Sequence, residues 1–257
     1  MKFPQGEMYT LLERLADYYN RPDFIANDPI QIPHRYQKKS DIEVSGFFAA
    51  LISWGGRKAI IEAASRLMEL MDDAPSEFIM GHQPHDLKRF ERFVYRTLQP
   101  DDTLFLITAL QRALQKHGSM EQLFMSGWHP TDTDLYGAIT AVRKELLSSP
   151  HLPRSRKHLA NPEAGSAAKR LHLYLRWMVR SDNNGVDFGL WKNIRPNQLV
   201  CPLDIHTGNA ARDLGLLTRK ANDRVAALEL TNRLKQFDPN DPVKYDFALF
   251  GYGKQLA

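Results

Sequence analysis

The sequence of 257 residues contains a single cysteine, Cys201. One thiol cannot close an internal disulfide, bind a four-cysteine iron–sulfur cluster or build a multi-cysteine zinc site, so these features are excluded. No apolar run approaches the roughly 18 residues that a membrane-spanning helix needs. The first thirty residues carry charges throughout and lack the apolar centre of a secretory leader. We therefore expect a cytoplasmic protein that does not bind a membrane.

Motifs for nucleotides and metals are also missing. The chain has no glycine-rich loop of the Walker or Rossmann type and no HExxH segment. His82 and His85 in HQPH have a spacing that metal ligands can use, but no third ligand accompanies them. We expect neither a metal ion nor another cofactor.

Signals for β-structure are absent as well. We find no alternating apolar strand and no hairpin dipeptide between two strand-like runs. Apolar residues instead recur at helical spacing, as Leu12, Leu15 and Tyr19 do in EMYTLLERLADYYN. DDTLFLITALQRALQKHG starts with acids and ends with Lys116, His117 and a glycine, as the helix dipole favours. The pattern predicts an all-α fold.

The net charge of +4 says little, but the distribution of charge says more. Residues 154–180 contain seven Lys or Arg and one acid, an excess larger than that of the whole chain. Such a concentration of positive charge is typical of a nucleic-acid-binding surface. A solvated helix face next to an exposed loop is the alternative interpretation of the same charges.

A turn is predicted at the start of the largely apolar segment GSAAKRLHLYLRWMV. Pro162 and Gly165 interrupt the chain there, and the helix is expected to begin near Ser166. Backbone N–H groups of such a turn, followed by a helix N-terminus, can bind an anion such as a DNA phosphate. Lys169 then lies in the first helical turn, where the dipole disfavours a cation by ~0.3–1 kcal/mol.

The segment PLDIHTGNAARDLGL contains the second candidate residue. Asp204 can cap a helix from Ile205 to about Leu214, and an N-cap of this kind is worth about 0.5–2 kcal/mol. Capping alone would explain the aspartate. A catalytic role is compatible with it, because a carboxylate at a helix N-terminus is kept ionised by the amides around it.

Together these segments resemble the helix-hairpin-helix DNA glycosylase superfamily, which includes endonuclease III and the archaeal 8-oxoguanine glycosylase. The similarity rests on the turn from Gly165 to Lys169, on the Pro-x-Asp-x-His pattern at 202–206 and on Leu-Gly-Leu at 214–216. The chain departs from that family at Ala167, which replaces the second hairpin glycine. Segments KRLHLYLRWMVR and PLDIHT are also similar to those of an uncharacterised bacterial protein family.

The resemblance implies a fold of two helical lobes with a helix-hairpin-helix element and a cleft between them. One lobe is expected over residues 40–187, and the other combines residues 1–39 with 188–257. Lys169 and Asp204 are the implied catalytic residues.

The resemblance and the charges together imply two further groups of residues. The expected DNA-binding residues are Arg57, Arg154, Arg156, Lys157, Gly165, Ser166, Ala167 and Arg170. The expected base-pocket residues are Trp54, Trp177, Phe188, Trp191 and His206. Each aromatic side chain at helical spacing is also a candidate for ordinary core packing.

The implied function is that of a DNA glycosylase and lyase, which removes an oxidised purine from double-stranded DNA through a lysine Schiff base. Such a protein is expected to be a monomer. The first alternative is a non-catalytic DNA-binding module of the same fold. The second is an enzyme or scaffold of RNA or small-molecule metabolism that retains only the helical architecture.

Overall fold

The computed structural model describes residues 3–256, with side chains described up to Gly253. This part of the chain forms helices and no β-strand, so the predicted all-α fold is confirmed for it. Contacts divide the chain into two compact units. The terminal unit comprises the described residues of Met1–Ala26, Pro130–Leu135 and Pro162–Ala257, and the central unit comprises Asn27–His129 and Tyr136–Asn161.

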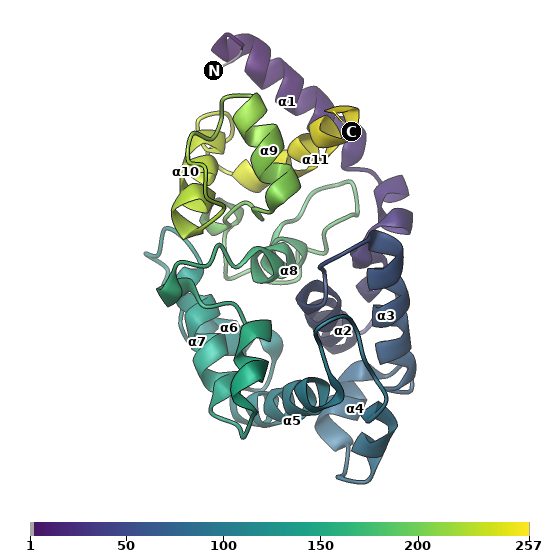
Figure 1. Ribbon diagram of the computed structural model, residues 1–257. Coiled ribbons are helices and arrows are strands. Elements are labelled where there is room, and N and C mark those ends of the chain that lie inside the picture. Colours follow the sequence, from purple (N-terminus) through teal and green to yellow (C-terminus); the bar gives the residue numbers. More distant parts are fainter. Residues whose placement is uncertain (1–2, 257) are drawn as a thin grey trace. The chain divides into compact units, whose positions relative to one another are not determined.

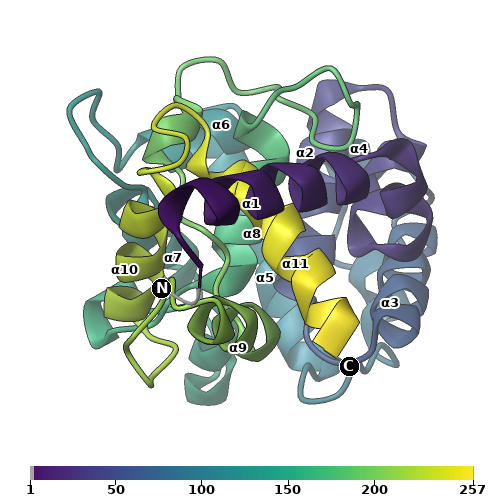
Figure 2. The same ribbon diagram turned by 90° about the horizontal axis from the view of Figure 1, so that it is seen from above.

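Five α-helices build the terminal unit. They are α1 (Gln5–Tyr19), α8 (Lys169–Val179), α9 (Ile205–Asp213), α10 (Arg224–Leu234) and α11 (Tyr245–Leu256). Short 3-10 turns lie at Pro162–Ala164, Pro196–Gln198 and Pro242–Lys244, and the turn Pro22–Asn27 ends on the first residue of the central unit. Helix α11 packs against both α1 and α9, and Figure 2 shows α1 in purple crossing α11 in yellow.

The terminal unit contains a network of buried ion pairs. Arg176 on α8 and Arg180, the residue that follows this helix, both pair with Asp187, at 3.2 and 3.0 Å respectively. Arg180 also pairs with Asp241 at 2.9 Å, and both guanidinium groups lie over the ring of Phe247 on α11. The side chains of Arg176, Arg180 and Asp187 are at most 3% exposed. They therefore form a desolvated ion network, which joins α8 to the 180–190 segment.

The central unit contains the remaining α-helices. They are α2 (Lys39–Leu51), α3 (Arg57–Glu69), α4 (Pro75–Gly81), α5 (Pro100–His117), α6 (Met120–Met125) and α7 (Tyr136–Leu147). Short 3-10 turns lie at Pro29–Gln31, Pro33–Arg35, Asp86–Phe90 and Pro153–His158. The long helix α5 contacts α4, α6 and α7, and these neighbours lie around it in Figure 1.

The division into units differs from the predicted division at 40–187. Residues 162–187 belong to the terminal unit together with 130–135, and residues 27–39 belong to the central unit. The reason lies in long-range polar contacts of the 162–187 segment: Arg176 pairs with Asp246 of α11, and Arg224 N donates to the carbonyl oxygen of Gly165 at 2.9 Å. The predicted cleft between two lobes stays a prediction. Within the described residues no helix is both long enough and apolar enough to cross a bilayer.

Candidate functional site

The hairpin before α8 is anchored to the start of α10. Besides the backbone bond from Arg224, a bridge joins Ser166 to Asp223. Gly165 has φ +85°, which glycine adopts without steric cost, and Ala168 is left-handed at φ +50°. The N–H of Ala168 donates to Ser166 Oγ at 3.1 Å. These contacts fix the residue that follows, Lys169, as the first residue of α8.

The hairpin residues differ in exposure. Gly165 is exposed and Ser166 is half-buried, whereas Ala167 is only 7% exposed and belongs to the core. Of the predicted anion site, Gly165 and Ser166 therefore form the part that solvent reaches.

Asp204 is the N-cap of α9, as its sequence pattern predicted. Its Oδ1 accepts from the N–H of Thr207 at 2.9 Å, and its backbone oxygen accepts from Asn222 Nδ2 at 3.1 Å. The helix begins at Ile205 and ends at Asp213, one residue before the predicted end. The side chain and the backbone of Asp204 are thus each held by one hydrogen bond, and the second carboxylate oxygen, Oδ2, is left for another partner.

That partner is Lys169. Its Nζ lies 3.6 Å from Asp204 Oδ2, and the two side chains are 28% and 37% exposed. The residues that the sequence singled out therefore lie together, although 35 positions separate them. Because solvent reaches both side chains, the pair itself contributes no more than about 1 kcal/mol to stability. An amine and a carboxylate at this separation, both accessible, can act on one substrate.

A third charged residue, Asp246 on α11, lies behind this pair and was not predicted. It is 8% exposed and ion-pairs with Arg176 Nη1. Burial, and then the negative charge of Asp204, raise the pKa of Asp246 to about 6, although Arg176 opposes the shift. Its only signal in the sequence is an acid near the start of the apolar segment KYDFALFGYGK, and nothing local connects that acid with Lys169.

The single cysteine lies next to Asp246. Cys201 Sγ is 4.0 Å from Asp246 Oδ1, and the residue is fully buried. Burial, together with the charge of Asp246, raises the pKa of the thiol well above its usual range. A neutral, enclosed thiol is a poor nucleophile, so Cys201 is not a candidate for covalent catalysis.

Two further basic residues follow Lys169 on α8. Arg170 is half-buried, and burial lowers its pKa to about 10. His172 is completely buried, and burial together with the charge of Arg224 lowers its pKa to about 3. His172 is therefore a neutral core residue at physiological pH, whereas Arg170 keeps its charge close to Lys169.

Two of the predicted base-pocket residues are core residues instead. Trp177 and Trp191 are fully buried, and the ring of Trp191 meets Tyr174 edge-to-face at 5.5 Å between centroids. The prediction for these two is corrected, because side chains packed in this way offer no free face to a base. Phe188 is half-buried and His206 is exposed.

The fifth base-pocket residue, Trp54, belongs to the central unit. It is half-buried, and its backbone oxygen accepts from the hydroxyl of Tyr95 at 2.7 Å. The two rings meet edge-to-face at 5.4 Å. The exposed Arg57 follows after two glycines, as the first residue of α3.

The basic segment 154–157 is ordered by one buried acid. Asp102 accepts from Ser155 Oγ at 2.6 Å and lies 3.1 Å from His158 Nε2 and from Arg154 Nη1. Arg154 also pairs with Asp101 at 3.1 Å. The expected contact of Arg154 with DNA stays a prediction, and its charge is balanced by two carboxylates in this structure.

The neighbours of Arg154 are exposed as well, but their partners differ. Arg156 and Lys157 are both exposed, and Arg156 Nε donates to His151 Nε2 at 3.0 Å. Neither residue has an acidic partner in the described structure. Among the described residues of this segment, they are the exposed cations that no carboxylate balances.

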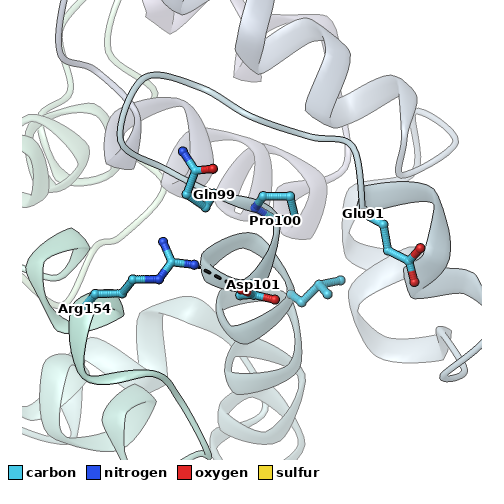
Figure 3. A pocket seen from close by; sticks show the side chains of 6 residues that line it. Glu91, Gln99, Pro100, Asp101 and Arg154 are labelled. Carbon is cyan, nitrogen blue, oxygen red and sulfur yellow. Dashed lines mark hydrogen bonds and ion pairs between the residues drawn. The ribbon is translucent and has the colours of Figure 1, made fainter.

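An open pocket of about 620 Å³ lies beside Arg154 (Figure 3). Its lining consists of Glu91, Gln99, Pro100, Asp101, Leu104 and Arg154. Figure 3 shows Arg154 directed at Asp101, so the arginine is already occupied by an acid of the same pocket. Within the described residues no group of three or more His, Cys, Asp or Glu side chains is arranged to hold a metal ion.

Comparison with known proteins identifies the family but not an activity. No curated protein and no solved structure matches the chain. A family model described as "Protein of unknown function (DUF2400)" matches residues 28–255, which include α2 to α10 and nearly all of α11. The match covers most of the sequence, both units included, and the chain therefore belongs to the DUF2400 family.

Proposed function

We propose that this protein is a DNA glycosylase with an associated lyase activity, which removes an oxidised purine from double-stranded DNA. The observation that carries the proposal is the 3.6 Å approach of Lys169 Nζ to Asp204 Oδ2 at the ends of two helices. The helix-hairpin-helix resemblance implies this pairing, and a purely capping aspartate would have no need of the lysine.

Lys169 would act as the nucleophile. Its neutral amine attacks C1′ of the damaged nucleotide, and the bond between C1′ and the base nitrogen breaks with its electron pair leaving on the base. The nitrogen bonded to C1′ loses a proton, the base takes up a proton, and the base departs. The sugar ring then opens as O4′ gains a proton, which leaves an iminium between Lys169 and C1′.

Asp204 would stabilise the positive charge that develops on the sugar as the base leaves. Its carboxylate is fixed by the Thr207 N–H, so little reorganisation is needed at the moment of reaction. Loss of a C2′ proton and departure of the 3′ phosphate then nick the strand. Hydrolysis of the Schiff base returns Lys169.

The test is borohydride reduction during incubation with duplexes that contain single lesions. The panel includes 8-oxoguanine, other oxidised bases, uracil and an abasic site. We expect a covalent protein–DNA adduct with an oxidised purine and with the abasic site, detected by electrophoresis. Absence of an adduct and of cleavage on every duplex would reject the glycosylase.

A non-catalytic DNA-binding module is the second candidate. The burial of Trp177 and Trp191 favours it, because two side chains expected to receive a base are occupied in the core. It predicts salt-dependent duplex binding without an adduct. A protein that neither forms an adduct nor binds duplex DNA at low salt fits the third alternative, a role in RNA or small-molecule metabolism.

The exposed basic residues Arg156 and Lys157 of the central unit give a prediction about DNA binding. Arg156→Ala and Lys157→Ala should each weaken binding to all duplexes alike, because each removes about one phosphate contact. The slope of log K against log salt should fall by about one unit per substitution. Fluorescence anisotropy between 50 and 200 mM salt, as in other DNA-binding proteins, measures both quantities.

Arg154→Ala is the matched comparison for these two variants. Its charge is already balanced by Asp101 and Asp102, so we expect a smaller change in salt slope than for Lys157→Ala. Equal changes at the two positions would contradict the assignment of DNA contacts in this segment.

A further inference from the structure

The loop that precedes α5 in the central unit contains a tight turn of two residues, Arg96 and Thr97. The N–H of Tyr95 donates to the carbonyl oxygen of Leu98 at 3.0 Å, and the N–H of Leu98 donates to that of Tyr95 at 2.9 Å. Turns of this length place their first residue at positive φ, and Arg96 accordingly has φ +52°. Glycine, asparagine and aspartate adopt this conformation most readily, so an arginine here strains the backbone.

Arg96 differs from the other residues that share this conformation. Among the described residues that are not glycine, the others with positive φ are Asp72, Asp73 and Ala168. Two of these are aspartates, which tolerate positive φ, and the third is a small residue of the hairpin before Lys169. Strained backbone clusters at binding and catalytic sites, so the long cationic side chain of Arg96 is a candidate for a function outside the fold.

Packing fixes the turn and leaves the charge of its arginine available. The Tyr95 hydroxyl donates to the backbone oxygen of Trp54 at 2.7 Å, and the two rings meet edge-to-face. Gly55 comes next with φ +112°, and a Cβ at that position would lie only 2.7 Å from Arg96 Nη1. The glycine therefore leaves the space in which the end of the arginine lies. Arg96 is exposed, and no carboxylate of the described residues pairs with it.

Trp54 joins this turn to the basic segment 154–157. Its ring lies 6.1 Å from that of His158 between centroids, with 30° between the planes. His158 directly follows Arg156 and Lys157, the exposed cations of that segment. Because the same indole also meets the tyrosine of the turn, the two loops are neighbours. The central unit thus presents cations from two distant segments of the chain in one region.

We propose that Arg96 is a DNA-binding residue, which pairs with a phosphate of the duplex backbone on the same surface as Arg156 and Lys157. This inference rests on the DNA substrate of the proposed function and does not involve the chemistry at Lys169. A guanidinium can form two parallel hydrogen bonds with a phosphate. Because the strained turn restricts where the side chain can point, Arg96 loses less conformational entropy on binding than a freely moving arginine does.

Arg96→Asn tests the contact, because it removes the guanidinium and introduces a residue that tolerates positive φ. We expect the slope of log K against log salt to fall by about one unit. The affinity should fall at least about threefold, and alike for damaged and undamaged duplexes, since a phosphate contact reads no base. Fluorescence anisotropy of the full-length protein with each duplex measures both quantities.

Arg92→Asn is the matched control for charge. Arg92 is an exposed arginine just upstream of the turn, and its φ is not positive, so we expect an unchanged salt slope. An unchanged slope in Arg96→Asn would overturn the proposal. Equal losses in the two variants would overturn it as well, because they would report the net charge of the protein rather than a contact at the turn.

The melting temperature separates DNA binding from a structural role of Arg96. Since asparagine relieves the strain of the turn, Arg96→Asn should melt no more than about 2 °C below the wild type. A larger fall would show that the fold itself needs the arginine, and would overturn the proposal.

The outcomes for this contact and for the proposed function are distinct. If the wild type forms the borohydride adduct and Arg96→Asn binds DNA as the wild type does, only the role of Arg96 is refuted. If the wild type binds duplex DNA without an adduct and Arg96→Asn loses a unit of slope, the glycosylase is refuted and the contact stands. A wild type that binds no duplex DNA at low salt, or binds only RNA, refutes both.

Discussion

Lys169→Ala should abolish the borohydride adduct and strand nicking, a loss of at least about 10³-fold, while duplex affinity changes little. The reason is that the substitution removes the amine 3.6 Å from Asp204, and the proposed Schiff base forms on that amine. The lost ammonium is already balanced by an acid in the free protein, so its removal should alter the field at the DNA surface only slightly. Electrophoretic trapping and anisotropy on the same lesion duplex measure the two effects.

Two variants separate chemistry from charge in this experiment. Lys169→Arg keeps a positive charge near Asp204 but cannot form a Schiff base, so it should bind DNA and form no adduct. Lys192→Ala removes an exposed lysine of the same unit and should leave the adduct yield unchanged. An adduct that persists in Lys169→Ala would move the nucleophile to another residue and reject the assignment.

Short-range sequence patterns were enough to locate the two segments that contain Lys169 and Asp204. Asp204 caps α9 because a short acidic side chain satisfies the first free N–H groups of a helix, a rule that depends only on nearby residues. Gly165 likewise marks a turn because its φ of +85° is strained for other residues. The α-helical fold class followed from periodicity for the same local reason.

Contacts between distant segments could not be read in this way. The pairing of Arg176 with Asp246 joins residues 70 positions apart, and neither side chain has a local feature that selects its partner. Trp191 lies in an irregular segment, where periodicity does not predict burial, yet it is fully buried against Tyr174. Arg154 showed only a positive charge in the sequence, whereas the fold places it against Asp101 and Asp102.

Asp187→Asn should lower the free energy of unfolding by about 3 kcal/mol, because it leaves two buried guanidinium groups with less compensation. Asp187 is the residue that Arg176 and Arg180 share, at 3.2 and 3.0 Å, and its side chain is completely buried. The other partners, Asp246 and Asp241, remain, so we expect a weakened fold rather than an unfolded chain. Urea unfolding at pH 7 should show a lower midpoint with little change in slope.

Asp101→Asn provides the matched substitution at the surface. Its carboxylate is 63% exposed and pairs with Arg154 at 3.1 Å, so screening by water should limit the loss to less than about 1 kcal/mol. Hydrogen exchange shows which part of the fold is weakened. In Asp187→Asn, the increase in amide exchange rate should be greatest in α8 and the 180–190 segment, because the network joins them. Equal losses for the two variants, or faster exchange confined to the central unit, would mean that the buried network does not hold α8, and with it Lys169, in place.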